Sequence, residues 1–154
     1  MVLAPGAAWA TKRWAASHFR ELAASWDGPV SVLGGPGEEA LCAEVAGTSA
    51  EIVVERGFDR TIELLGRARV VVSGDTGLMH LGGACGARVV AVFGSTHPDD
   101  GFFCSPGEVV QRDLACRPCT LHGRQACPLG HLQCMDIGVT RVLEAVRRVW
   151  DGAS

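Results

Sequence analysis

Two short runs of apolar residues constrain the fold of this chain most strongly. Residues 70–72 are all valine, and residues 89–93 read Val-Val-Ala-Val-Phe. A strand without polar positions must be covered on both faces, as happens in parallel sheets flanked by helices. A glycine-containing turn at residues 73–77 and a helix expected from about Leu78 to Cys85 separate the runs. This strand–helix–strand unit predicts an open α/β sheet with right-handed crossovers.

The same alternation continues along the rest of the chain. Hydrophobic periodicity predicts further strands at residues 2–4, 30–33, 52–54 and 109–111, and helices at residues 14–26, 38–46, 61–67 and 139–150. The helix over 61–67 is expected to bury Ile62, Leu64 and Leu65. Residues 116–134 are rich in cysteine and predicted to be irregular. With no linker, residues 1–154 are expected to form one Rossmann-like domain, a parallel sheet with helices on both faces.

Composition excludes several classes of protein. Hydrophobic residues make up 47% and the net charge is only -3, which excludes a disordered chain. Fourteen Lys and Arg face 17 Asp and Glu, so no nucleic-acid partner is expected. The apolar first ten residues precede Lys12 and Arg13, the reverse of a secretory signal. We therefore expect a cytoplasmic protein whose thiols are mostly reduced.

Glycine-bearing turns follow the predicted strands at residues 5–8, 34–37 and 74–77. In an open parallel sheet, ligands bind beyond the carboxyl ends of the strands. Asp75, Thr76 and Gly77 open a helix there, and the amides at a helix N-terminus suit phosphate. The alternative is that Asp75 or Thr76 only caps the helix. The chain contains neither the Gly-x-Gly-x-x-Gly dinucleotide loop nor the P-loop motif.

Charged or polar residues near these turns are further candidates. Lys12 could place a positive charge beside a diphosphate, although it could also be a solvated surface lysine. Glu38 could accept hydrogen bonds from ribose hydroxyls, or only interact with the helix dipole. His80 follows Thr76 by four residues and so shares its helix face; alone, it could equally be a partly buried histidine without a ligand.

Several motifs occur in an informative order. They are Pro-Gly-Ala at 5–7, Lys-Arg-Trp at 12–14, Gly-Gly-Pro at 34–36, Ser-Gly-Asp-Thr-Gly-Leu-Met-His at 73–80 and Val-Phe-Gly-Ser-Thr at 92–96. Together they resemble the C-terminal half of glycosyltransferase family 9, the ADP-heptose:lipopolysaccharide heptosyltransferases, and heptosyltransferase II in particular. The resemblance extends from Val2 to the last helix.

This resemblance implies a GT-B enzyme with two Rossmann-like domains, of which the C-terminal one binds the nucleotide-sugar donor. Lys12 would contact the donor diphosphate, Glu38 the ribose, and Thr76 and Gly77 the phosphate through backbone amides, while Asp75 and His80 would lie against the diphosphate and sugar. The implied donor-binding positions are Ala7, Ala8, Lys12, Glu38, Asp75, Thr76, Gly77 and His80. Lys12 and Asp75 would support catalysis without acting as the base.

The resemblance also implies what the chain needs from elsewhere. In the family, transfer inverts the anomeric centre, needs no essential metal, and uses an aspartate base from the N-terminal domain. The present chain starts on the first strand of the second domain, so alone it is expected to bind the donor without transferring the sugar. The N-terminal domain would bring the lipid A-core acceptor, at the inner face of the inner membrane. A stand-alone nucleotide-binding module that docks a partner is the main alternative, and an oxidoreductase fragment a third.

The cysteine-rich segment carries a second pattern. Cys116, Cys119, Cys127 and Cys134 could ligate a structural zinc tetrahedrally, with His122 and His131 as alternative ligands. Reduced structural thiols and disulfides are the other interpretations. A metal knuckle here would be the docking element of the stand-alone module. Cys104, in a predicted loop, has no assigned role.

Overall fold

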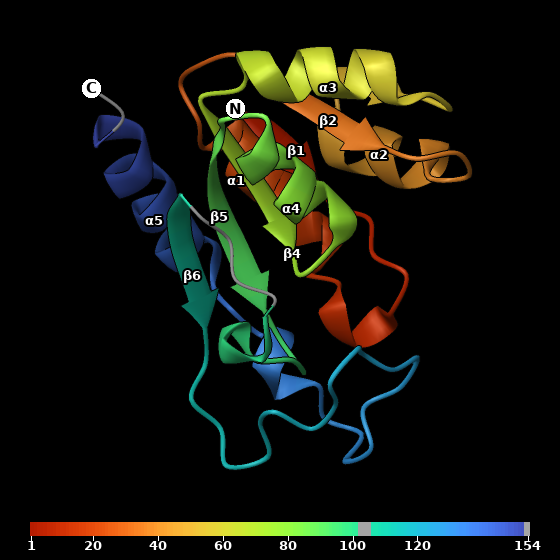
Figure 1. Ribbon diagram of the computed structural model, residues 1–154, viewed down its shortest axis with the longest axis vertical. Helices are drawn as coiled ribbons and strands as arrows, with labels where there is room; N and C mark the ends of the chain where they lie inside the picture. The colour runs from red at the N-terminus through yellow and green to blue at the C-terminus, as the bar shows by residue number, and fades with distance from the viewer. Residues whose placement is uncertain (102–105, 153–154) are drawn as a thin grey trace.

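A parallel sheet forms the centre of the computed structural model, which describes residues 1–101 and 106–152 (Figure 1). Within these ranges the sheet has six strands: β1 (Val2–Ala4), β2 (Ser31–Gly34), β3 (Glu51–Val54), β4 (Val70–Gly74), β5 (Arg88–Phe93) and β6 (Gly107–Gln111). Their order is β3-β2-β1-β4-β5-β6, and every neighbouring pair is parallel. This is the Rossmann strand order, so the predicted fold class is confirmed.

Helices cover both faces of the sheet, as the apolar runs require. One face packs against α1 (Ala16–Ala24), α2 (Glu39–Ala46) and α5 (Val139–Asp151), and the other against α3 (Phe58–Arg67) and α4 (Gly77–Ala84). Val70 and Val72 belong to the first core, whereas Val71 between them belongs to the second. Successive strand residues point to opposite faces, so the run at residues 70–72 must be apolar at every position to fill both cores.

Helix α3 differs from its prediction. It begins at Phe58, and its buried residues are Thr61 and Leu65, which are four residues apart and so share one face. Leu64 is half-buried, but Ile62 is 46% exposed, so the expectation that Ile62 packs in the core was wrong. Ile62 lies about 100° around the helix from Thr61 and about 60° from Leu65, at the edge of the buried face that is open to solvent.

The cysteine-rich segment crosses the carboxyl end of the sheet. Apart from the short helix η3 (Gln133–Met135), residues 116–134 have no helix or strand, as predicted. In Figure 1 this segment, coloured cyan to light blue, lies beyond the strand ends and beside the loop that follows β1. Cys104 lies outside the described residues. Within the described part of the chain, no helix is both long and apolar enough to cross a membrane.

Candidate functional site

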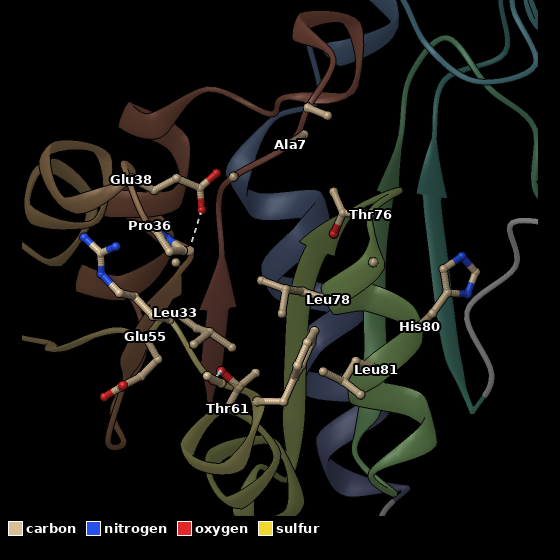
Figure 2. A pocket seen from close by; sticks show the side chains of 18 of the residues that line it. Ala7, Leu33, Pro36, Glu38, Glu55, Thr61, Thr76, Leu78, His80 and Leu81 are labelled. Atoms are coloured by element: carbon tan, nitrogen blue, oxygen red, sulfur yellow. Dashed lines mark hydrogen bonds between the residues drawn. The ribbon is translucent and has the colours of Figure 1, made fainter.

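Two adjoining hollows open at the carboxyl ends of the strands. The wide hollow, about 810 Å³, lies between the turns after β1 and β2 and the first turns of α3 and α4 (Figure 2). The narrow hollow, about 500 Å³, is lined by Ala8, Trp9, Lys12, Asp75, Thr76, Gly77 and His122. Ala8, Thr76 and Gly77 line both hollows. The sequence-predicted residues Ala7, Glu38 and His80 line the wide hollow, so every predicted donor-binding position borders this composite site.

A buried ion pair forms one wall of the narrow hollow. Lys12, at the end of the short helix η1 (Ala10–Lys12), places its Nζ 2.5 Å from Asp75 Oδ2. The two side chains are 9% and 3% exposed, so Lys12 is not a solvated surface residue. Thr96 Oγ1 donates a hydrogen bond of 2.7 Å to the same Asp75 oxygen. Asp75 therefore orients Lys12 and does not serve as a helix cap.

The N-terminus of α4 lies where the two hollows meet. Thr76 precedes the helix in an extended conformation, and its side chain does not cap it. Its hydroxyl instead lies 3.0 Å from Ser73 Oγ. Gly77, the first helical residue, lines both hollows, and a Cβ added to it would meet no atom within 4 Å. The positive end of the helix dipole thus faces open space large enough for an anion.

Glu38 lies on the other side of the wide hollow from Thr76 (Figure 2). Its Oε2 accepts a hydrogen bond of 2.8 Å from Gly35 N, which fixes the carboxylate beside the turn after β2. A Cβ at Gly6 would come within 2.0 Å of Glu38 Oε1, so a larger residue there would displace the Glu38 carboxylate. Between Glu38 and α4 the lining is largely apolar and includes Leu33, Leu78 and Leu81.

His80 occupies a different position from the other polar residues. It is exposed on α4, on the rim of the wide hollow across from Glu38 (Figure 2). The narrow hollow that Lys12 and Asp75 border does not include it. The structure therefore groups Lys12 with Asp75, Thr76 and Gly77 at the narrow hollow, and places His80 on the rim of the wide one.

The cysteine-rich segment contains free thiols. Cys134 is buried, while Cys116, Cys119 and Cys127 are partly buried. Among the described residues, which include these four, no three Cys, His, Asp or Glu side chains are arranged to hold a metal ion. A structural zinc site there thus stays a prediction. The pKa of Cys134 is raised, mainly because its thiol is buried. The pKa of Cys127 is lowered by backbone N–H groups, and that of Leu132 has the largest effect.

Sequence reasoning missed several residues around the site. Phe58, at the start of α3, lines the wide hollow and is 72% exposed. Its place shortly after a strand of the sheet could have drawn attention to it. Thr96 ends the Val-Phe-Gly-Ser-Thr motif at residues 92–96, but the sequence indicated no role for its hydroxyl. No sequence pattern indicated a role for Arg117, because its hydrogen bonds to Gly94 and Thr96 join segments far apart in the chain.

Comparison with known proteins identifies the family of this chain. Residues 1–123 match the family model of glycosyltransferase family 9 (heptosyltransferase). The chain belongs to glycosyltransferase family 9. A lipooligosaccharide heptosyltransferase 2 of Campylobacter jejuni is 29% identical over 161 aligned residues, which cover 96% of this chain and 50% of that protein. The family 9 chain described here thus spans about half the length of this curated relative.

Solved structures of family 9 proteins share the fold. ADP-heptose lipopolysaccharide heptosyltransferase II of Escherichia coli superposes with a TM-score of 0.76 at 23% identity, covering 98% of this chain and 46% of that one. The dodecameric iron-containing heptosyltransferase TibC, in complex with ADP-D-beta-D-heptose, superposes with a TM-score of 0.75 at 18% identity, covering 99% of this chain and 45% of that one. At these identities the likeness supports the fold alone.

Proposed function

We propose that this chain is the donor-binding half of an inverting heptosyltransferase of lipopolysaccharide core biosynthesis, with ADP-heptose or a related nucleotide sugar as its ligand. One observation carries the proposal: a buried lysine–aspartate pair and a helix N-terminus border the same hollow, next to a largely apolar one. Membership of family 9 supports it, as does the ADP-heptose complex of the structurally similar TibC.

The two hollows suit the two chemical ends of such a donor. Leu33, Leu78 and Leu81 offer apolar surface to a purine, and Phe58 an aromatic face at the rim. The Glu38 carboxylate is available to ribose hydroxyls. Lys12 and the N-terminus of α4 would hold the diphosphate, and the sugar would extend along the narrow hollow toward Trp9 and His122.

The chemistry follows from this placement. When the sugar leaves the donor, negative charge grows on the departing nucleoside diphosphate. Lys12 and the dipole of α4 are already oriented toward that position, so they stabilise the charge without reorganising. Transfer also requires a base for the acceptor hydroxyl. We assign the base, the lipid A-core acceptor and its binding at the inner face of the inner membrane to an N-terminal domain that this chain does not include.

Isothermal titration calorimetry with ADP, ADP-heptose and adenosine tests donor binding. Native protein is expected to bind all three, and Glu38→Gln to weaken adenosine and ADP binding about tenfold, because a charged acceptor of ribose hydrogen bonds is lost. Glu39→Gln is the matched control, since Glu39 is adjacent and exposed but does not line either hollow. It should keep both dissociation constants within about twofold. A folded native chain that binds neither ADP nor ADP-heptose contradicts the proposal.

A turnover assay tests whether sugar transfer needs an N-terminal domain in addition to this chain. With ADP-heptose and a core acceptor, the isolated chain is expected to release no ADP above the hydrolysis background. Adding the N-terminal half of a family 9 enzyme as a separate polypeptide should restore some transfer. A stand-alone binding module would bind ADP equally well but gain no activity from that addition. Transfer by the isolated chain would show that it contains its own base.

A further inference from the structure

Arg117 joins the cysteine-rich segment to the carboxyl ends of β5 and β6. Its Nε donates to the carbonyl of Gly94, and its Nη1 to the carbonyl of Arg112. Its Nη2 donates to the carbonyl of Thr96 at 3.0 Å and to Gln111 Oε1 at 3.1 Å. The planar guanidinium thus bonds to four acceptors from several loops, a fork that a lysine ammonium cannot reproduce.

One of those acceptors leads directly to the proposed diphosphate site. Thr96 is fully buried, its carbonyl accepts from Arg117, and its hydroxyl donates to Asp75 Oδ2 at 2.7 Å. The same Asp75 oxygen lies 2.5 Å from Lys12 Nζ. Arg117 therefore fixes the backbone of the residue whose side chain orients Asp75, and Asp75 in turn orients Lys12.

A second set of contacts reaches Lys12 from the other side. Cys119 N donates to the carbonyl of Ser95 at 3.1 Å, and Ser95 Oγ donates to Thr11 Oγ1 at 2.9 Å. Arg124 N donates to Thr11 Oγ1 at 2.9 Å, while Thr11 N donates back to the carbonyl of Arg124 at 3.1 Å. Thr11, which is 2% exposed, directly precedes Lys12. Residues 116–134 thus contact the loop that carries Lys12 and the loop after β5, whose Thr96 bonds to Asp75.

We propose that Arg117 is a positioning residue for the diphosphate end of the donor site, acting through Thr96 and Asp75 on Lys12. Residues 116–134 form a strap that holds the ion pair in place before the donor arrives. Holding the charged groups in advance removes an ordering cost from binding, so the strap strengthens affinity for the diphosphate. The inference rests on the proposed function, because it assigns the ligand chemistry at the same site.

Comparison of ADP with adenosine tests the role of Arg117. Adenosine would occupy only the wide hollow, whereas ADP would also reach Lys12. In Arg117→Lys, the dissociation constant for ADP is expected to rise about tenfold, as for the loss of a charge-assisted hydrogen bond, while that for adenosine stays within about twofold. Arg69→Lys is the matched control: its side chain donates to the carbonyl of Trp150 and lies over the Trp150 ring, away from residues 116–134. It should change neither value.

The isosteric variant Thr96→Val tests whether Arg117 acts on Lys12 through Thr96 and Asp75. It removes the hydroxyl bond to Asp75, and its effect on ADP binding should combine with that of Arg117→Lys less than additively, because both act on one chain of contacts. Equal weakening of ADP and adenosine in Arg117→Lys would show a general structural role and overturn the proposal, as would ADP affinity that stays within twofold of native. If Arg117→Lys fails to fold, Thr96→Val alone must give the selective loss of ADP binding.

Amide hydrogen exchange separates this inference from the proposed function. Without any nucleotide, Arg117→Lys is expected to speed exchange at the amides of Thr11 and Cys119, whose hydrogen bonds hold the strap. Arg69→Lys should leave both rates unchanged. Unchanged exchange in Arg117→Lys overturns the positioning role. If the native chain binds no ADP but exchange does increase in the variant, the strap is real and the proposed function is what fails.

Discussion

At the scale of single residues, the buried pair of Lys12 and Asp75 decides the electrostatics of the site. Removing two charges from water is costly, and their close contact and the hydrogen bond from Thr96 help to offset that cost. The pair is nearly neutral as a unit. In the proposed donor complex, the adjacent N-terminus of α4 would therefore supply much of the attraction for the diphosphate, while Lys12 would supply a fixed hydrogen-bond donor.

Because the two buried charges compensate each other, substitutions of Lys12 and Asp75 should have non-additive effects on the free energy of unfolding. Lys12→Met leaves the Asp75 carboxylate buried without its ammonium partner, so the free energy of unfolding should fall by about 3–5 kcal/mol. The double variant Lys12→Met, Asp75→Asn should recover most of that loss, because the amide oxygen still accepts from Thr96 and no charge is buried. Urea unfolding of the variants measures both values. A double variant less stable than Lys12→Met contradicts the prediction.

The residues near the site divide into those a sequence can reveal and those it cannot. Gly77 and Asp75 were predictable, because parallel strands place their following turns at one edge of the sheet. Thr96 and Arg117 were not, because their roles come from hydrogen bonds that join residues 21 positions apart. No local periodicity reports such contacts.

At the scale of elements, the apolar runs predicted the central strands correctly because each is buried on both faces. Helix α3 was harder, because Phe58 and Ile62 lie on the same apolar stripe as Leu65 yet are exposed, and only the packed structure selects Thr61 and Leu65 for burial. The irregular segment 116–134 was predicted as irregular, but its path across the carboxyl end of the sheet was not. That path depends on side-chain and backbone contacts with Thr11, Ser95 and Thr96.

Within that segment, one loop creates a distinctive thiol environment. Backbone N–H groups lower the pKa of Cys127, that of Leu132 with the largest effect and those of Leu129, His131 and Gly130 with smaller ones. Cys42, in α2, shows the reverse, because burial, with smaller contributions from Glu38 and Glu39, raises its pKa to about 11. The loop therefore stabilises a thiolate, whereas the core suppresses one.

This contrast predicts selective alkylation. A lowered pKa leaves more Cys127 in the reactive thiolate form at any pH near neutrality, so iodoacetamide should modify Cys127 faster than Cys42 in the native protein. As the pH falls from 9 to about 7, the rate at Cys127 should decrease less than that of an ordinary thiol, whose pKa is about 8.5. Peptide mass spectrometry after timed quenching measures the rates, with Cys127→Ser as the control. Faster labelling of Cys42 than of Cys127 is the contrary outcome.

At the scale of the whole molecule, two hydrophobic cores share one sheet. Val71 contributes to the core under α3 and α4, and its neighbour Val72 to the core under α1, α2 and α5. Because the same strands carry both cores, neither core can be lost while the other stays intact. The described residues should therefore unfold as one cooperative unit.

Paired substitutions test this cooperativity. Val71→Ala and Val72→Ala each remove fully buried methyl groups, and each should lower the free energy of unfolding by about 1.5–3 kcal/mol. Both should shift the urea midpoint without changing the slope of the transition. Circular dichroism and tryptophan fluorescence should report the same midpoint in each variant. Separate midpoints for the two probes would mean that the cores unfold independently.

The partition of the site into two hollows has a practical consequence for inhibitor chemistry. The hollows share Ala8, Thr76 and Gly77, whereas the turn after β2 and helix α3 border the wide hollow alone, and Lys12, Asp75 and His122 the narrow one alone. Substituents on a purine would meet Phe58 and Arg56 without touching Lys12. Medicinal chemists could thus tune selectivity at one end of a nucleotide analogue, and replace its diphosphate at the other, as largely independent design problems.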